Sequence, residues 1–199
     1  MTASAIEVGR REARRQETEL RIHRCALRLT DERGLDGWTM DELADASEVS
    51  RRTLFNYFPG KVDAVLGSTP ELPADALETF RTGGPTGRLL DDLEVLAERI
   101  LTDKEFDPET MALGRRALHC TPRLLMVAHE RFEQVMRDLV DHILRREGPQ
   151  FGEDRARLLL RVLVGVFDHT LDHLDTDDSG RSVAEIFHRH LRQARDLLA

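Results

Sequence analysis

The densest group of side chains suited to molecular recognition lies at positions 50–57, which read S-R-R-T-L-F-N-Y in a chain of net charge −8. Arginine can donate two hydrogen bonds to guanine O6 and N7, asparagine can pair with adenine, and a threonine methyl can contact thymine. Hydroxyl and ammonium groups can contact phosphates, which fix the register of a protein on DNA. The segment therefore has the side chains that reading duplex DNA requires, and the alternative is an ordinary polar helix face.

Two predicted helices would present these side chains. Thr39 and Glu42 have the T-x-x-E spacing of a capping box, which predicts a helix over about 39–46. A second helix is expected over about 50–58, because Pro59 disfavours helical geometry in the residue before it. The two helices and the short connection between them have the length and spacing of a helix-turn-helix.

Apolar residues are expected to bury the inner side of this helix pair. Leu43, Ala44 and Val49 would be buried at the turn between the two helices. Leu54 and Phe58 would be buried on the inner side of the second helix. The polar residues that this arrangement leaves outward or at the edges are Ser50, Arg51, Arg52, Thr53, Asn56 and Tyr57.

Positions 38–61 read W-T-M-D-E-L-A-D-A-S-E-V-S-R-R-T-L-F-N-Y-F-P-G-K and follow the segment D-E-R-G-L-D-G. This stretch resembles the signature of the TetR-like (TetR/AcrR) family of bacterial transcriptional regulators. Its F-N-Y-F-P-G-K end is especially close to the family's aromatic-x-Tyr-Phe-x-x-Lys close. The resemblance is at the level of motifs over residues 20–67, and over 68–199 it rests on length and helix order alone.

The resemblance implies DNA contacts at the positions that match the family's motif. Thr39 would contact a phosphate at the start of the first helix of the pair, and Tyr57 and Lys61 would contact the DNA backbone. The residues that would meet base edges or nearby phosphates are Arg51, Arg52, Thr53 and Asn56. The two adjacent arginines suggest a G-containing half-site. Phe55 departs from the pattern, because many members carry tyrosine there, and we expect this ring to pack among apolar residues.

A basic cluster precedes this region, and its residues are Arg10, Arg11, Arg14 and Arg15. As an arm it would reach along the minor groove or the phosphates, as basic arms do. The alternative of equal weight is a solvated, partly disordered tail. The first helix is expected to follow over about 12–33 and to end before Gly34.

Helical periodicity dominates the remaining sequence, and strand signals are almost absent, so the predicted fold is all-α with about nine helices. A three-helix head with the helix-turn-helix is expected in the N-terminal domain, 1–67, and a larger helical bundle in the C-terminal domain, 68–199. The later helices are expected over about 73–81, 86–103, 107–119, 121–147, 153–174 and from 182 to the C-terminus, after a short one over 61–67.

The last two long helices are expected to pair between subunits. Positions 158–167 are apolar on nearly every side, and exposing such a helix would be costly. In the resembled family these helices form a four-helix interface, which implies a homodimer; the alternative is a purely intramolecular core. The interface candidates are Leu159, Val162, Leu163, Val166, Phe167, Ile186, Phe187 and Leu191.

The resemblance also implies a pocket for an unknown small-molecule effector between the middle helices of the bundle. Its candidate lining residues are Leu93, Leu96, Met111, Arg115, His119, Leu125, His129, Phe132 and Met136. Methionine adapts its shape to apolar ligands, whereas the alternative is that each residue simply fills the core. The break G67-S-T-P70 makes the fourth helix shorter than in many family members, so the route from pocket to DNA-binding heads stays open.

No catalytic or cofactor signature is evident. The sequence contains no G-x-S-x-G, P-loop or Rossmann fingerprint, and Cys25 and Cys120 match no metal or redox spacing. His169 and His173 are four residues apart and can bind a metal at that spacing, but on an interface helix we expect them to form hydrogen bonds. The E-x-x-H spacing at 185–188 lacks the second copy that a di-iron bundle needs.

These observations predict a cytoplasmic, homodimeric regulator that binds a near-palindromic operator in double-stranded DNA. No stretch reaches the roughly 18 apolar residues of a membrane span, and the N-terminus lacks the apolar run of a secretion signal. We expect a repressor that a small-molecule inducer releases. The alternative is an all-α metal- or ligand-binding enzyme whose N-terminal head is purely structural.

Overall fold

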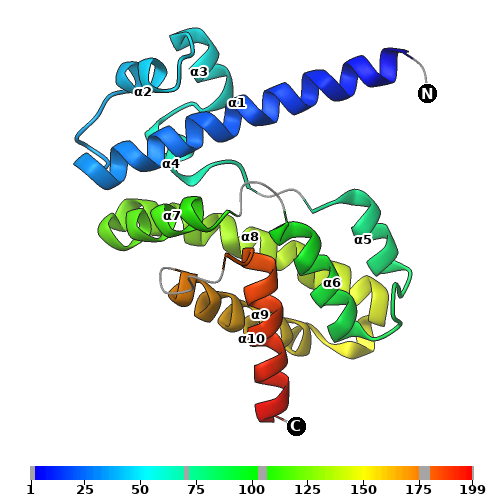
Figure 1. Ribbon diagram of the computed structural model, residues 1–199. Coiled ribbons are helices and arrows are strands. Elements are labelled where there is room, and N and C mark those ends of the chain that lie inside the picture. Colours follow the sequence, from blue (N-terminus) through cyan, green and yellow to red (C-terminus); the bar gives the residue numbers. More distant parts are fainter. Residues whose placement is uncertain (1–2, 70–71, 103–106, 175–179, 199) are drawn as a thin grey trace. The chain divides into compact units, whose positions relative to one another are not determined.

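The computed structural model describes residues 3–69, 72–102, 107–174 and 180–198 (Figure 1). In these ranges the chain forms ten α-helices and no strand, so the predicted all-α class is confirmed. The chain divides into two compact units, of which unit 1 comprises Met1–Thr69 and Leu113–Ala128. Unit 2 comprises Pro70–Ala112 and His129–Ala199. The functional division into 1–67 and 68–199 stays a prediction, and unit 1 also contains the later segment Leu113–Ala128.

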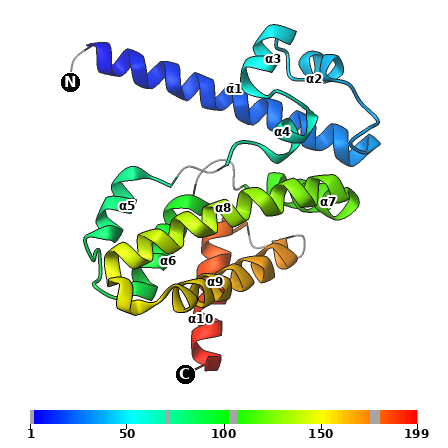
Figure 2. The same cartoon turned by 180° about the vertical axis from the view of Figure 1, so that it is seen from behind.

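Four N-terminal helices form most of unit 1. They are α1 (Ala3–Arg33), α2 (Met40–Ala46), α3 (Arg51–Tyr57) and α4 (Lys61–Leu66). Helix α1 contacts α2 and α4, and α2 contacts α3. In Figure 2, as in Figure 1, the N-terminal turns of α1 extend beyond these three shorter helices. Helix α1 therefore begins well before residue 12, where the sequence predicted its start, while its end at Arg33 is as predicted.

A single apolar core holds unit 1 together. Trp38, Leu43 and Leu54 are fully or almost fully buried in it. Leu113 of α7 (Pro108–Cys120) and Leu124 of α8 (Pro122–Glu147) belong to the same buried cluster. The short helices of the head are thus supported by both α1 and a segment more than forty residues further along the chain.

Unit 2 is a helical bundle. Besides parts of α7 and α8, it contains α5 (Ala74–Arg81), α6 (Leu89–Leu101), the 3₁₀ turn η2 (Pro149–Phe151), α9 (Glu153–His173) and α10 (Val183–Leu198). Helix α6 contacts α5 and α10, and α10 contacts α9. Phe80, Leu96, Ile143, Leu160 and Ile186 are at the centre of its core.

Apart from the start of α1, the predicted helix boundaries agree closely with these elements. Helix α4 ends at Leu66, and Gly67 has a φ of 69°, a left-handed conformation that favours glycine and stops the helix. The fourth helix is therefore short, as predicted. Pro70 in the predicted break and the predicted helix end at residue 103 lie outside the described residues. Within the described ranges, no helix combines the length and the apolar character needed to cross a membrane.

A buried ion pair fastens three segments of unit 2 to one another. The side chains of Arg146 in α8 and Asp92 in α6 are 4% and 0% exposed, and Arg146 donates a hydrogen bond to the Asp92 carboxylate. Arg146 also donates to the carbonyl oxygen of Phe80 at 3.0 Å and lies 4.7 Å from the centre of that ring. The backbone N–H and the hydroxyl of Thr86 both donate to Asp92 at 2.7 Å. Every member of the cluster is therefore satisfied, which is what makes the burial of two charges tolerable.

The environment of Asp92 favours its ionised form. Burial alone would raise its pKa, but hydrogen bonds from Thr86 and Arg146 outweigh burial and hold the pKa below the ordinary value. The resulting stabilisation is present above the pKa of the unfolded chain, about 3.9. It is lost as the pH falls through the lower pKa of the folded chain.

We predict that Arg146→Met lowers the free energy of unfolding by about 3–5 kcal/mol, because the variant leaves the Asp92 charge buried without its partner. Denaturant unfolding at neutral pH, followed by helical circular dichroism, measures the loss. Arg145→Met is the matched control, since Arg145 is an exposed neighbour on α8, and its change should stay within about 0.5 kcal/mol. Equal unfolding midpoints for the two variants would contradict the assigned role of the pair.

Candidate nucleic-acid interface

The turn between α2 and α3 is closed by a defined set of hydrogen bonds. The N–H of Glu48 donates to the carbonyl of Asp45 at 3.1 Å, and the N–H of Val49 donates to the carbonyl of Ala44 at 3.0 Å. This is the pattern of a Schellman motif, whose central residue adopts a left-handed conformation. Glu48 does so with a φ of 54°, which is unusual for a residue other than glycine. The motif fixes the direction in which α3 leaves α2.

Both helices of the pair begin with a side-chain cap. Thr39 accepts a hydrogen bond from the N–H of Glu42 at 3.2 Å, and its own N–H donates to the Glu42 carboxylate at 2.7 Å. The predicted capping box is therefore present. Hydrogen bonds from the side chain and backbone of Thr39 hold the pKa of Glu42 below its ordinary value. Ser50 caps α3 by accepting from the N–H of Thr53 at 3.0 Å.

Helix α3 has one buried side and one open side. Leu54 is fully buried, and Phe58 just beyond the helix is 2% exposed. The side chains that the structure leaves exposed on or beside α3 are Ser50, Arg51, Arg52, Phe55 and Asn56, while Thr53 and Tyr57 are partly buried. The structure thus brings the predicted base-reading residues to one solvent-facing surface.

Arg51 does not stand alone on this surface. It donates a hydrogen bond to Asp41 of α2 at 3.2 Å, and its guanidinium lies 5.7 Å from the centre of the Phe55 ring. Phe55 is 42% exposed, so the expectation that it packs among apolar residues is wrong. At position i+4 of α3 the ring faces the same side as Arg51, whereas Leu54 takes the buried side.

Two other predicted contact residues are engaged inside the head. The ammonium group of Lys61 donates to the carbonyl oxygen of Leu35 at 3.1 Å and lies 4.9 Å from the centre of the Trp38 ring. The hydroxyl of Thr39 also donates to Glu42 at 2.9 Å. These side chains therefore support the fold of the head, whatever further contacts they make.

The basic cluster lies on the N-terminal part of α1 and not in an extended tail. Arg10, Arg11, Arg14 and Arg15 are all exposed on this helix. Their spacing places Arg10 and Arg14 one turn apart, and Arg11 and Arg15 likewise. The cluster is therefore a helical basic strip.

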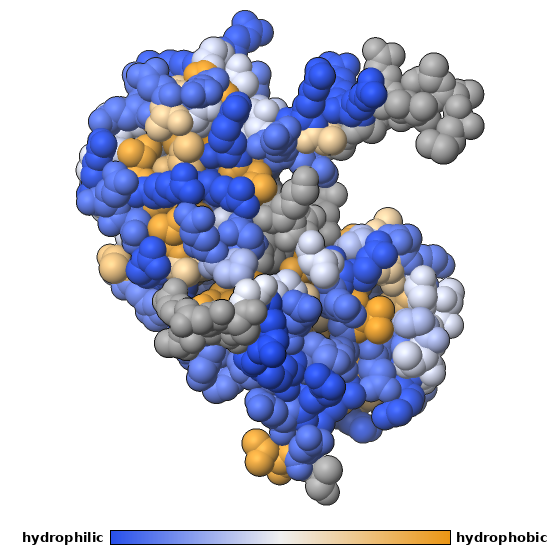
Figure 3. All heavy atoms as spheres, in the orientation of Figure 1, coloured by the Kyte–Doolittle hydropathy of each residue, from blue (hydrophilic) through white to orange (hydrophobic). Residues whose placement is uncertain are grey.

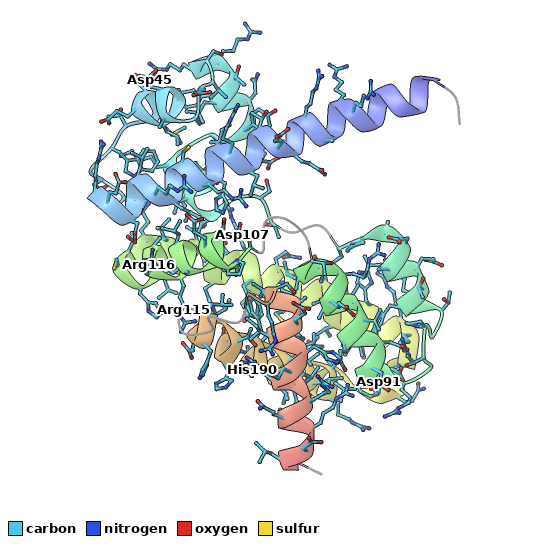
Figure 4. The ribbon with its side chains drawn as sticks, in the orientation of Figure 1. Asp45, Asp91, Asp107, Arg115, Arg116 and His190 are labelled. Atoms are coloured by element: carbon cyan, nitrogen blue, oxygen red, sulfur yellow. The ribbon has the colours of Figure 1, made fainter. Side chains whose placement is uncertain are left out.

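A cavity of about 470 Å³ lies within unit 1, between the end of α1 with the following loop and the end of α7. At its wall Arg116, labelled in Figure 4, donates two hydrogen bonds to Asp31 at 2.9 and 3.2 Å. These bonds hold the pKa of Asp31 below its ordinary value. None of the nine predicted pocket residues lines this cavity.

The nine predicted pocket residues have different environments. Leu93, Leu96 and Met136 are buried in the core of unit 2, and Met111 and Phe132 pack against it. Three are exposed, namely His119, Leu125 and His129, and Arg115 is partly buried. Arg115, His119 and Leu125 belong to unit 1, and the other six belong to unit 2.

The predicted dimer residues also differ in exposure. Leu163, Ile186, Phe187 and Leu191 are buried within unit 2. Partly buried positions packed against this core are Leu159, Val166 and Phe167. Val162 is 44% exposed, and the neighbouring Leu158 is 66% exposed. On the face seen in Figure 3, apolar residues lie in small groups among hydrophilic ones.

Three imidazole rings gather where α9 and α10 meet. The ring centres of His169 and His173 are 4.3 Å apart, and those of His169 and His190 are 4.8 Å apart. Nδ1 of His173 is 2.8 Å from the carbonyl oxygen of His169, and Nδ1 of His190 is 3.1 Å from the hydroxyl of Thr170. Across the described residues, no group of three or more His, Cys, Asp or Glu side chains has a geometry that could hold a metal ion.

The helix-turn-helix, set against α1 and α4 at the head of an all-helical chain, defines the class of protein. Residues 22–65 match the family model described as bacterial regulatory proteins, tetR family. Three uncharacterized HTH-type transcriptional regulators, from Mycobacterium bovis and two strains of Mycobacterium tuberculosis, are 28% identical over 131 residues. The match covers 66% of this chain and spans 62% of the length of these relatives.

Two solved structures are similar to this chain, and the first shares its fold. A protein of Mesorhizobium loti MAFF303099 assigned to the TetR family of transcriptional regulators matches with a TM-score of 0.57 and 18% identity, over 92% of this chain and 95% of that one. FadR of Thermus thermophilus, a TetR-family repressor solved in complex with lauroyl-CoA, matches with a TM-score of 0.46 and 25% identity, over 87% and 91%. Residues 22–65 therefore match the tetR family of bacterial regulatory proteins, as the signature at 38–61 predicted.

We predict that Lys61→Met lowers the free energy of unfolding of unit 1 by about 1–2 kcal/mol, because it removes a hydrogen bond to Leu35 and a cation–π contact with Trp38. Fluorescence of Trp38, the single tryptophan, reports unfolding of this unit. Arg52→Met is the control, since this exposed side chain makes no ion pair with any described residue, and its effect should be within about 0.5 kcal/mol. Equal stability of Lys61→Met and the wild type would refute the structural role of Lys61.

Proposed function

We propose that the chain is a transcriptional repressor that works as a homodimer on a near-palindromic operator. The observation that carries the proposal is the two-sided character of α3. Leu54 anchors the helix in the head, and Arg51, Arg52 and Asn56 are exposed on the other side. A rigidly mounted short helix with such a face fits the major groove of duplex DNA, where arginine and asparagine discriminate between bases.

The rest of the head supplies candidates for phosphate contacts. Thr39 lies at the N-terminus of α2, where the helix dipole favours an anion. The helical basic strip, from Arg10 to Arg15, adds exposed cations at a distance from α3. Contacts between this strip and phosphates would release counterions from the DNA and so strengthen binding independently of sequence.

The partner in the proposed dimer is a second copy of the chain, held through α9. Leu158, Val162, Gly165, His169 and Asp172 are all exposed and follow one another at alternating spacings of four and three residues. Such spacing aligns side chains along one stripe of a helix, as in the seam between paired helices. Gly165 within the stripe allows close approach of another helix, while the buried Leu163 holds α9 to its own bundle.

The proposed effector site lies in unit 2, where Met111 and Phe132 pack against the core that contains Leu93, Leu96 and Met136. Methionine side chains can rearrange around an apolar ligand at low cost. The dimer would have one arrangement that fits DNA and another that does not. An inducer would release the operator by binding the second arrangement more tightly than the first. A bacterial repressor acts where the chromosome is, so we place the protein in the cytoplasm.

We predict that Arg51→Ala with Arg52→Ala weakens binding to a duplex selected from random DNA by at least about thirtyfold, since two base-reading side chains are lost. Fluorescence anisotropy at fixed salt measures the affinity. The control Arg137→Ala with Arg145→Ala removes the same charge from exposed positions of α8 and should retain binding. Helical content of both variants should equal that of the wild type. Undiminished DNA binding by the α3 variant would disprove the proposal and favour the alternative of an enzyme with a structural head.

We predict that Val162→Arg converts the dimer to a monomer, because it places a charge in the middle of the exposed stripe of α9. Sedimentation velocity at micromolar concentration measures the assembly state. Leu197→Arg is the matched control, because Leu197 is also an exposed apolar residue, at 86%, but lies on α10. Dimers that persist in Val162→Arg, or that dissociate only in Leu197→Arg, would place the interface elsewhere.

A further inference from the structure

Arg51 and Arg52 are neighbours in sequence, but they have different surroundings. Arg51 lies between the carboxylate of Asp41, at 3.2 Å, and the ring of Phe55, at 5.7 Å. Arg52 is exposed and makes no ion pair with any residue that the structure describes. The two cations are therefore unequal, and one of them has its direction set by a residue of another helix.

Phe55 is the second unusual feature of this surface. Its ring is 42% exposed on the polar side of α3, although Leu54 beside it is fully buried. The exposed part of the ring contributes nothing to folding through apolar burial, but phenylalanine can contact the 5-methyl group of thymine in the major groove. The ring thus offers an apolar reading group immediately beside an arginine that can read guanine.

We propose that Arg51 reads a guanine and Phe55 reads a thymine at neighbouring base pairs, and that Asp41 is the positioning residue that directs Arg51 to the guanine. The proposal rests on the DNA-binding function proposed above and adds the bases that one part of α3 recognises. The 5.7 Å between the Arg51 guanidinium and the Phe55 ring suits neighbouring base pairs, which stack about 3.4 Å apart.

Asp41 is suited to this role because its ion pair contributes little to folding and its charge repels DNA phosphates. Its ion pair with Arg51 is exposed, with 69% and 63% of the two side chains accessible, so it contributes little to folding. Near DNA the carboxylate repels phosphates and so disfavours the use of Arg51 as a general phosphate anchor. A guanidinium held in one orientation also loses less freedom on binding a base edge.

The role of Phe55 can be tested with duplexes that lack single groups. The probes are the duplex that the wild type selects from random DNA and copies in which deoxyuridine replaces each thymidine in turn. Deoxyuridine lacks only the 5-methyl group. At one position per half-site the wild type should lose about fourfold in affinity, the value for one buried methyl group. Phe55→Ala should bind the methylated and unmethylated duplexes equally at that position.

The role of Asp41 can be tested with 7-deazaguanine, which lacks the N7 acceptor. At the guanine next to the sensitive thymine, the wild type should lose about fivefold or more. Asp41→Asn should lose this discrimination. For DNA without the site, the slope of its log binding constant against log salt concentration should be steeper than that of the wild type by about one. Asp41→Glu, which keeps the carboxylate, should restore part of the discrimination.

Asp45→Asn is the matched control, because Asp45 is another exposed carboxylate on α2, one turn further on, as labelled in Figure 4. It removes the same charge and should leave the 7-deazaguanine discrimination unchanged. Equal losses in Asp41→Asn and Asp45→Asn would overturn the positioning role. An equal deoxyuridine penalty in the wild type and Phe55→Ala would overturn the thymine contact.

The same experiments distinguish a failure of the proposed DNA-binding function from a failure of the proposed base contacts. A wild-type chain that selects no particular sequence from random DNA has no operator, and then both the proposed function and this inference fall. A chain that selects a site, yet shows no thymine-methyl or N7 sensitivity at adjacent base pairs, remains a DNA-binding regulator. In that case only the roles of Phe55, Arg51 and Asp41 are refuted.

Discussion

The burial of Leu54 is the interaction on which the functional surface depends. Helix α3 has seven residues, and an isolated helix of that length is unstable in water. Its cap at Ser50 satisfies one end, but its position comes from Leu54, which is fully buried in the same cluster as Leu43 and Ile22. The polar residues of α3 have a defined direction only because the opposite side has this anchor.

Charges have contrasting uses in the two units. Arg146 and Asp92 are buried, saturated with hydrogen bonds and committed to holding unit 2 together. Arg51 and Asp41 are exposed, so exchanging one partner for DNA leaves no buried charge behind. An ion pair can serve recognition when water already solvates both members, whereas a buried pair of the same residue types can serve only the fold.

Apolar surface is also divided between fold and association. The sequence marks α9 as apolar nearly all round, but it does not tell which residues face the molecule's own core. In the structure Leu163 is buried and Leu158 and Val162 are exposed, so packing within unit 2 leaves part of the apolar surface of α9 open, and the proposed dimer would cover it. Ile186 and Phe187, which the sequence also offered as interface residues, are buried in the core of unit 2.

The sequence by itself determined the all-α class, the capped starts of the short helices and their signature, because these depend on residues within a few positions of one another. The T-x-x-E box at Thr39 is such a feature. Only the tertiary structure decided that Phe55 faces solvent, that Lys61 bonds to Leu35, 26 residues away, and that Arg51 meets Asp41. Local rules give each helix two or more compatible faces, and packing against the rest of the chain selects one of them.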